Sequence, residues 1–198
     1  MFYYAGIGSR ETPKEFLDLF TKIASWLSKN GYVLRSGGAD GADLAFEKGV
    51  TNNLKEIYLP WKYFNNSNSD LVVHDEEAFQ LAEKFHPYWQ ILKQGAKKLH
   101  ARNTHQVLGR DLLTPSDFII CWTKNGKELG GTAEAIRIAK AYNIPIFNCG
   151  KYTDINKCRQ DLWDFLKKNI KQRGQRNKIK CLDDSANLSN KDDILKEF

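Results

Sequence analysis

The sequence has few cysteines, and they do not form the pattern of a disulfide or metal framework. None of the four belongs to a Cys-x-x-Cys pair or lies near a histidine at metal-ligand spacing. Cys121 and Cys149 fall in strand-like runs, and we expect them to be reduced core residues. The histidines are not spaced as a metal pair with a carboxylate. We therefore expect neither a metal ion nor a cofactor.

Long apolar runs are also missing. No run is long enough to span a bilayer. Met1 leads directly into a strand-like segment, which is not how a signal peptide begins. The 198 residues are 41% hydrophobic and 27% charged, as in an ordinary globular protein. We therefore expect a cytoplasmic protein with one hydrophobic core and no membrane partner.

Positive charge is in excess, but it is unevenly spread. The net charge is +6, and basic residues crowd one stretch near the end of the chain: Lys167, Lys168, Lys171, Arg173, Arg176, Lys178 and Lys180. This stretch is either a solvated helix end and tail or a contact for nucleic acid or polyphosphate. Aromatic residues do not interleave there, which argues against base stacking. We expect a domain over residues 1–171 and a polar tail over residues 172–198.

Strand-like and helix-like segments alternate along the chain. The strand-like segments are residues 2–7, 32–36, 56–61, 116–123 and 144–148, and the helix-like ones are residues 13–30, 42–48, 75–85, 88–113, 132–142 and 155–170. Helix-length connections between strands imply a mainly parallel sheet with helices on both faces. The pattern predicts an α/β, Rossmann-like three-layer fold in which residues 75–113 form a helical insertion. Residues 62–74 are asparagine-rich without a period and are predicted to be a surface loop.

Three glycine-bearing turns, each after a strand-like run and before a helix-like segment, are the most informative feature. They are Gly6-Ile7-Gly8-Ser9-Arg10, Ser36-Gly37-Gly38-Ala39-Asp40-Gly41-Ala42-Asp43 and Gly130-Gly131-Thr132-Ala133-Glu134. Glycine lets a ligand approach the backbone closely, and a helix N-terminus offers free N–H groups and partial positive charge. Ligands of open parallel sheets bind at the carboxyl ends of the strands. The turns therefore predict a crevice for a phosphate-bearing molecule.

Charged residues in these turns have two interpretations each. Arg10 suits a phosphate, because its planar fork matches phosphate oxygens, or it pairs with Glu11 on the surface. Asp40 can cap the following helix, or Asp40 and Asp43 can accept hydrogen bonds from a ribose or a base. A carboxylate repels phosphate, so these aspartates are expected to face the neutral part of a nucleotide. The carboxylate of Glu134 either stabilises the first turn of the following helix through the helix dipole or is catalytic.

The predicted helix before the fourth strand is rich in polar side chains. Arg102, His105, Gln106 and Arg110 come close to one face at steps of three and four. This face is either solvated or directed into the ligand site. In the second case Arg102, Asn103 and Arg110 bind the ligand.

The three turns together resemble the SLOG superfamily of Rossmann-like proteins over roughly residues 2–148. This group includes the DNA-processing protein DprA and the LOG phosphoribohydrolases, and the small DprA-like proteins common in bacteriophage genomes look most alike. His100-Ala101-Arg102-Asn103 is similar to the His-Glu-Arg-Lys motif of LOG-type enzymes. The third turn is shorter than their Pro-Gly-Gly-x-Gly-Thr-x-x-Glu motif. Counted from Thr132, the position of the catalytic glutamate in that motif is occupied by Ala135, so Glu134 would have to take over the role of that glutamate.

The resemblance implies a protein that binds a nucleotide or a nucleotide-derived signal, such as an ADP-ribose or cyclic-nucleotide compound. If the gene is viral, sequestering a host immune signal is a coherent purpose. Two alternatives stay open: a nucleotide phosphoribohydrolase that cleaves the base–ribose bond, and a DprA-like mediator that binds single-stranded DNA. Whether the protein is an enzyme is undecided. The resemblance also implies a homo-oligomer, and we expect only weak, non-specific binding of nucleic acid.

Overall fold

The computed structural model describes the fold of residues 1–177 and the side chains of residues 1–170. The last helix, α6 (Ile155–Asn177), continues beyond the end at residue 170 that the sequence suggested. The rest of the predicted tail lies outside the described residues. So do the basic side chains from Lys171 onward.

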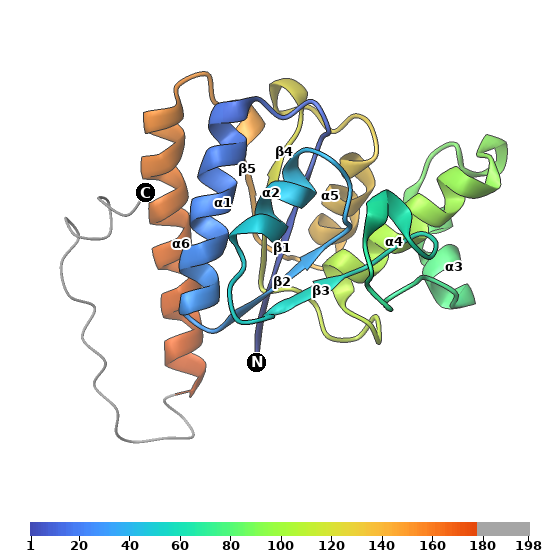
Figure 1. Ribbon diagram of the computed structural model, residues 1–198, viewed down its shortest axis with the longest axis horizontal. Coiled ribbons are helices and arrows are strands. Elements are labelled where there is room, and N and C mark those ends of the chain that lie inside the picture. Colours follow the sequence, from blue (N-terminus) through green and yellow to red (C-terminus); the bar gives the residue numbers. More distant parts are fainter. Residues whose placement is uncertain (178–198) are drawn as a thin grey trace.

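A five-stranded, all-parallel sheet forms the centre of the molecule (Figure 1). Its strands are β1 (Phe2–Gly8), β2 (Tyr32–Ser36), β3 (Lys55–Ile57), β4 (Phe118–Trp122) and β5 (Ile146–Asn148). They are ordered β3-β2-β1-β4-β5, so the chain starts in the middle of the sheet and β1 pairs with both β2 and β4. The carboxyl ends of β1 and β4 therefore lie side by side. The predicted Rossmann-like fold is confirmed.

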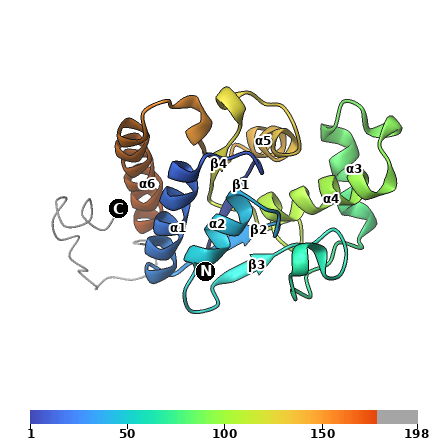
Figure 2. The same cartoon turned by 45° about the horizontal axis from the view of Figure 1, so that its top comes forward.

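Helices cover both faces of this sheet. They are α1 (Lys14–Lys29), α2 (Ala42–Gly49), α3 (Glu76–Phe85), α4 (Gln94–Leu108), α5 (Thr132–Ala141) and α6. Successive strand residues point to opposite faces. Tyr4 packs in a core with α1, α2 and α6, whereas the next residue, Ala5, packs in a second core with α4 and α5. Figures 1 and 2 show α1 beside α6 on the first face.

The predicted helical insertion is present, but it is divided differently. A 3₁₀ turn at Trp89–Ile91 precedes α4, which ends at Leu108 because Gly109 takes the left-handed φ of 83°. Residues 109–117 are therefore a loop, where a helix was predicted as far as residue 113. The α3 end of the insertion projects away from the sheet (Figure 2).

Three smaller features of the fold concern the start of α1, two cysteines and the apolar character of the helices. Pro13, which makes no side-chain cap, stands before α1, and the hydroxyl of Thr12 donates to the Ser9 carbonyl at 2.7 Å. Cys121 and Cys149 are buried free thiols, as predicted. Within the described residues, no helix combines the length and apolar character needed to cross a membrane.

Candidate functional site

A cleft of about 560 Å³ lies where the glycine turns meet, at the carboxyl ends of β1 and β4. We call it the glycine cleft. Nine of the predicted ligand residues line it: Gly8, Ser9, Arg10, Asp43, Arg102, Asn103, Gly130, Gly131 and Thr132. Other lining residues include Glu11, Leu99, His100, Gln106, Lys124 and Ala135. Residues as far apart in the sequence as Gly8 and Gly131, more than 120 positions, thus form one site.

The first turn uses its glycines for packing. A Cβ on Gly6 would come within 2.5 Å of the Phe46 ring, and one on Gly8 within 2.7 Å of the Ala42 Cβ. These glycines therefore let α2 approach β1. What the first turn presents to the cleft is Ser9 and the exposed side chain of Arg10.

The second turn packs beneath two side chains of the cleft wall. A Cβ on Gly37 would collide with Arg102 and Gln106, so these two side chains lie directly over the glycine. The exposed Asp40 accepts a hydrogen bond from Asn65 at 2.9 Å, and no side chain caps α2. The predicted ligand residues Ser36, Gly37, Gly38, Asp40 and Gly41 do not line the cleft itself.

Asp43 holds the first two turns together. Its buried carboxylate accepts the N–H groups of Gly8 at 3.2 Å and Ala39 at 3.4 Å, and Arg102 Nη1 lies 3.8 Å from it. Burial raises the pKa of Asp43, and the neighbouring Arg102 guanidinium opposes that rise. The carboxylate is thus already engaged by the protein, although it borders the cleft.

The third turn differs because its glycines face open space. A Cβ built on Gly130 or Gly131 would meet nothing within 4 Å, and Gly130 has a left-handed φ of 76°. Helix α5 begins directly after them at Thr132 without a side-chain cap. This backbone is the part of the site that a ligand can approach most closely.

The cleft side of α4 is buried, so the solvated-face interpretation was wrong. Arg102 is only 8% exposed and Gln106 only 1%. Arg102 Nη1 donates to the Gly37 carbonyl at 2.5 Å, and Nη2 donates to Asn103 Oδ1 at 3.2 Å. Burial lowers the pKa of Arg102, and Asp43 opposes this. Arg102 Nε and Gln106 Nε2 have no hydrogen-bond partner among the described residues, so two residues that line the cleft carry unsatisfied buried donors.

Glu134 lies behind the cleft wall, and its neighbour Ala135 lines the cleft. The fully buried carboxylate contacts His100 Nδ1 through Oε2, with Asn103 Nδ2 at 3.5 Å, while Oε1 has no partner in the described part of the chain. His100 lines the cleft, so Glu134 can act on a ligand through that ring. A carboxylate that orients an imidazole is an arrangement used in acid–base chemistry.

Several cleft residues were not assigned to the site from the sequence, among them Leu99, His100, Gln106 and Lys124. Helical spacing offered a signal for the first three, because residues 99 and 106 lie three and four positions from Arg102, and residue 100 lies three positions from Asn103. Lys124 offered none. No three histidine, cysteine or acidic side chains of the described residues gather where they could hold a metal ion.

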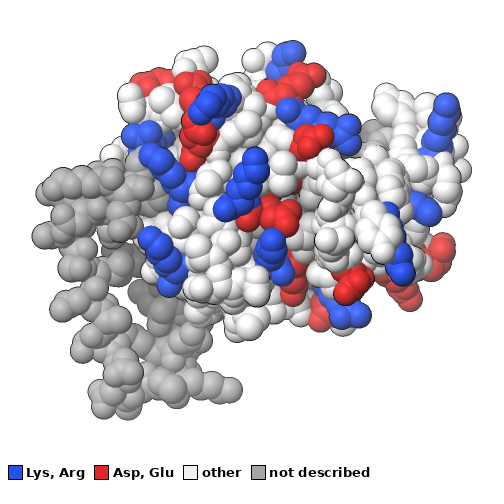
Figure 3. Space-filling view, in the orientation of Figure 1, with Lys and Arg blue, Asp and Glu red and all other residues white. Residues whose placement is uncertain are grey.

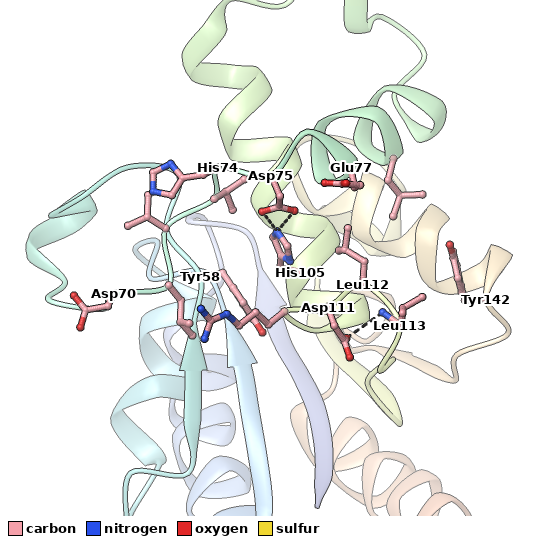
Figure 4. A pocket seen from close by; sticks show the side chains of 15 residues that line it. Tyr58, Asp70, His74, Asp75, Glu77, His105, Asp111, Leu112, Leu113 and Tyr142 are labelled. Carbon is pink, nitrogen blue, oxygen red and sulfur yellow. Dashed lines mark hydrogen bonds and ion pairs between the residues drawn. The ribbon is translucent and has the colours of Figure 1, made fainter.

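A second and larger pocket, of about 830 Å³, lies on the other side of α4 (Figure 4). We call it the histidine pocket; its polar lining includes Tyr58, His74, Asp75, His105, Arg110 and Asp111. Arg110 therefore lies apart from the glycine cleft. The buried His105 ring has Gly109 O 3.0 Å from Nδ1 and Asp75 Oδ2 3.0 Å from Nε2, and it stacks on Tyr58.

The tyrosine in this pocket is also fully engaged. Tyr58 donates its hydroxyl to Glu56 at 2.7 Å, and burial raises the pKa of Tyr58. Among the described residues that line the histidine pocket, none has a buried polar side-chain atom without a partner. The buried polar groups of this pocket therefore already have partners within the protein.

Comparison with known proteins adds a likeness of fold. No family model matches the sequence, and no curated protein matches it. The solved structure of DNA processing protein A from Helicobacter pylori, described for its single-stranded DNA binding mode, resembles this chain with a TM-score of 0.51 and 22% identity. The match covers 74% of this chain and 64% of that one. At this identity the likeness shows a DprA-like fold alone.

Proposed function

We propose that this protein binds a nucleotide or a nucleotide-derived signalling molecule in the glycine cleft. The observation that carries the proposal is the pair of buried donors, Arg102 Nε and Gln106 Nε2, that have no partner among the described residues. A buried donor left unpaired costs about 1–3 kcal/mol. Acceptor atoms of a ligand would remove that cost, and the open backbone at Gly130 and Gly131 gives such a ligand access.

The charges around the cleft favour an anionic ligand. Arg10, Arg102 and Lys124 line it, together with the N-terminal end of α5. Of the acidic lining residues, Asp43 is engaged by backbone N–H groups, and Glu11 lies 3.5 Å from Lys124. We assign the phosphate of the ligand to Arg10 and the third turn, where exposed positive charge and open backbone occur together.

The test is calorimetry of purified protein with nucleoside mono-, di- and triphosphates. Arg10→Ala should weaken binding by about 1.5–3 kcal/mol, the usual loss for a charge-assisted contact. Arg110→Ala is the matched control, because it removes an exposed arginine from the histidine pocket, and it should leave affinity unchanged. Equal affinity of wild type and Arg10→Ala would remove Arg10 from the site.

The expectations about family, assembly, location and biological purpose belong to the same proposal. They are membership of the SLOG superfamily, a small bacteriophage DprA-like relative as the nearest type, a homo-oligomer in the cytoplasm, and sequestration of a host immune signal if the gene is viral. Native mass spectrometry of protein purified from its host tests two of these at once. It would give the mass of any retained nucleotide and the number of chains per particle.

A second candidate is single-stranded DNA binding, which the structural likeness to the Helicobacter protein favours. Basic and acidic side chains intermingle on the face in Figure 3, which offers DNA no continuous positive track there. Lys167 also lies 3.6 Å from Asp164. We expect weak binding that falls steeply with salt and is lost when Lys167, Lys168, Lys171 and Arg173 are neutralised together. Tight binding at physiological salt would reverse the ranking.

A third candidate, hydrolysis of the base–ribose bond, rests on the contact between His100 and the buried Glu134. Under this proposal the protonated imidazole of His100 gives its proton to the base as the base–ribose bond breaks, and the water that adds to the ribose carbon returns a proton to the imidazole. The assay is release of free base from nucleoside monophosphates by wild type and by Glu134→Gln. Robust release that Glu134→Gln abolishes would make the protein an enzyme, whereas no release leaves it a binder.

A further inference from the structure

The loop that follows β3 is fixed against the glycine cleft. Asn65 Nδ2 donates to the Gly38 carbonyl at 3.0 Å and to Asp40 Oδ1 at 2.9 Å. Phe64 is buried, and its ring centroid lies 5.9 Å from the guanidinium carbon of Arg102. A segment predicted to be a plain surface loop therefore contacts both the second turn and a cleft-lining arginine.

This loop holds its backbone in an unfavourable conformation. Tyr63, Asn65 and Asn66 have left-handed φ angles of 60°, 50° and 59°. Asparagine tolerates this region, but a tyrosine adopts it only at a cost in free energy. The conformation leaves the side chain of Tyr63 72% exposed and that of Trp61 40% exposed. The free protein thus maintains strain and exposed aromatic surface in the same few residues.

Both aromatic residues belong to the loop that packs beside the cleft, although neither of them lines it. On one side, Asn65 contacts Asp40, and the next residue, Gly41, lies against the backbone of Arg10, since a Cβ there would be 2.7 Å from Arg10 Cα. On the other side, a Cβ built on Gly95, one residue before the cleft-lining Ala96, would lie 4.0 Å from the Trp61 ring. We call Trp61 and Tyr63 the aromatic shelf.

We propose that the aromatic shelf stacks the base of the nucleotide whose phosphate lies in the glycine cleft; this inference rests on the proposed function. Flat aromatic side chains stack on nucleobases of any type. Polar residues flank the two aromatics along the chain (Lys62, Asn65, Asn66 and Ser67), so the exposed aromatic pair matches one small planar group and not a broad protein interface. The ligand class is therefore a nucleotide that keeps its base, in contrast to a sugar phosphate.

The experiment compares ligands with and without a base. Calorimetry is run with the four ribonucleoside monophosphates and with ribose 5-phosphate, on wild type, Trp61→Ala and Tyr63→Asn. The shelf variants should lose about tenfold affinity for the monophosphates, within the range that one stacked base contributes. Affinity for ribose 5-phosphate should stay at the wild-type level. Tyr88→Ala is the matched control, because that tyrosine is 68% exposed beyond α3, and it should change neither affinity.

Tyr63→Asn separates a binding role from a structural one. Asparagine suits the left-handed backbone at position 63, so this variant should melt at or above the wild-type temperature while it binds the monophosphates less tightly. Wild-type affinity for the monophosphates in both shelf variants, with binding still lost in an Arg102 variant, would overturn the shelf and leave the proposed function standing. Absence of any nucleotide binding by wild type would overturn both. Oligodeoxythymidylate is titrated in parallel, and shelf variants that lose affinity for it while they keep wild-type affinity for the monophosphates would assign the shelf to single-stranded DNA and overturn our inference.

Discussion

The two pockets beside α4 differ in how their buried polar groups are satisfied. The histidine pocket is larger, about 830 Å³ against 560 Å³ for the glycine cleft. Its buried polar side chains have partners within the protein, as the His105 ring has in the Asp75 carboxylate and the Gly109 carbonyl. The glycine cleft is smaller, yet Arg102 Nε and Gln106 Nε2 on its wall have no partner in the described chain. Unsatisfied polar atoms on residues that line a pocket, more than its volume, make that pocket a candidate for ligand binding.

The same helix supplies both pockets, which makes the difference informative. Arg102 and Gln106 reach one side of α4, and His105 reaches the other. His105 lies in the last turn of α4 and Asp75 directly before α3, so their contact joins the two helices of the insertion. We interpret the histidine pocket as a structural joint and the glycine cleft as a binding site. Four substitutions can break or sharpen this comparison.

The largest expected effect comes from Arg102→Gln. The variant removes a buried positive charge from the cleft, and nucleotide affinity should fall by about 1.5–3 kcal/mol, or roughly 10- to 150-fold. Calorimetry measures this loss, and circular dichroism checks that the variant folds although Asp43 has lost its cation. A comparable loss in Arg110→Ala would place the ligand in the histidine pocket and reverse our assignment.

The sequence predicted the sheet well because its signals are local. Apolar runs located all five strands, three of which are followed by a glycine turn, and the helical spacing located the helices between them. The roles of the glycines could not be read in this way. Gly6 and Gly8 are required by Phe46 and Ala42 packed against them, whereas Gly130 and Gly131 face open space. That difference depends on what lies opposite each glycine, which no local pattern contains.

The same limit applies to the walls of the cleft. Helical spacing placed Arg102 and Gln106 close together, but it left open whether their face is solvated. They are buried because the second turn lies directly beneath them. The left-handed backbone at Tyr63 was missed as well, because tyrosine has no preference for that conformation. Burial and strain at the site come from the tertiary structure.

A smaller effect, on stability alone, is expected from His105→Leu. The variant loses the contacts of both ring nitrogens and the stacking on Tyr58, so the free energy of unfolding should fall by about 1–3 kcal/mol. Nucleotide affinity should not change. Urea denaturation and calorimetry on the same preparation test both statements. Weakened nucleotide binding without loss of stability would show that this pocket is not a structural joint.

Gln106→Met should lower nucleotide affinity without lowering stability, and both changes should be smaller than those expected above. Methionine has nearly the same length but no donor to leave unsatisfied, so the ligand-free variant should be as stable as wild type or more stable by up to about 1 kcal/mol. Its affinity for nucleotide should decrease, because the amide no longer reaches the ligand. Destabilisation with unchanged affinity would mean that the amide serves the fold and would weaken the case for the cleft.

The smallest expected effect is on the pH dependence of stability, through His86. Its ring lies 4.3 Å from that of the cleft residue His100. Burial and then His100 lower the pKa of His86 from the ordinary 6.5, and Arg137 acts in the same direction while Glu134 opposes them. Below pH 6.5 the unfolded chain therefore binds a proton before the folded chain does, so this group makes stability fall as the pH falls towards its folded pKa.

The slope that His86 adds to the pH dependence of stability cannot exceed about 1.4 kcal/mol per pH unit. The variant His86→Phe should remove this slope from urea denaturation curves measured between about pH 5 and 7.5. Saturating nucleotide should reduce the same loss in wild type, because an anion in the cleft near His86 favours the protonated form of that ring. A ligand in the histidine pocket would leave it unchanged, so even this modest slope distinguishes the two pockets.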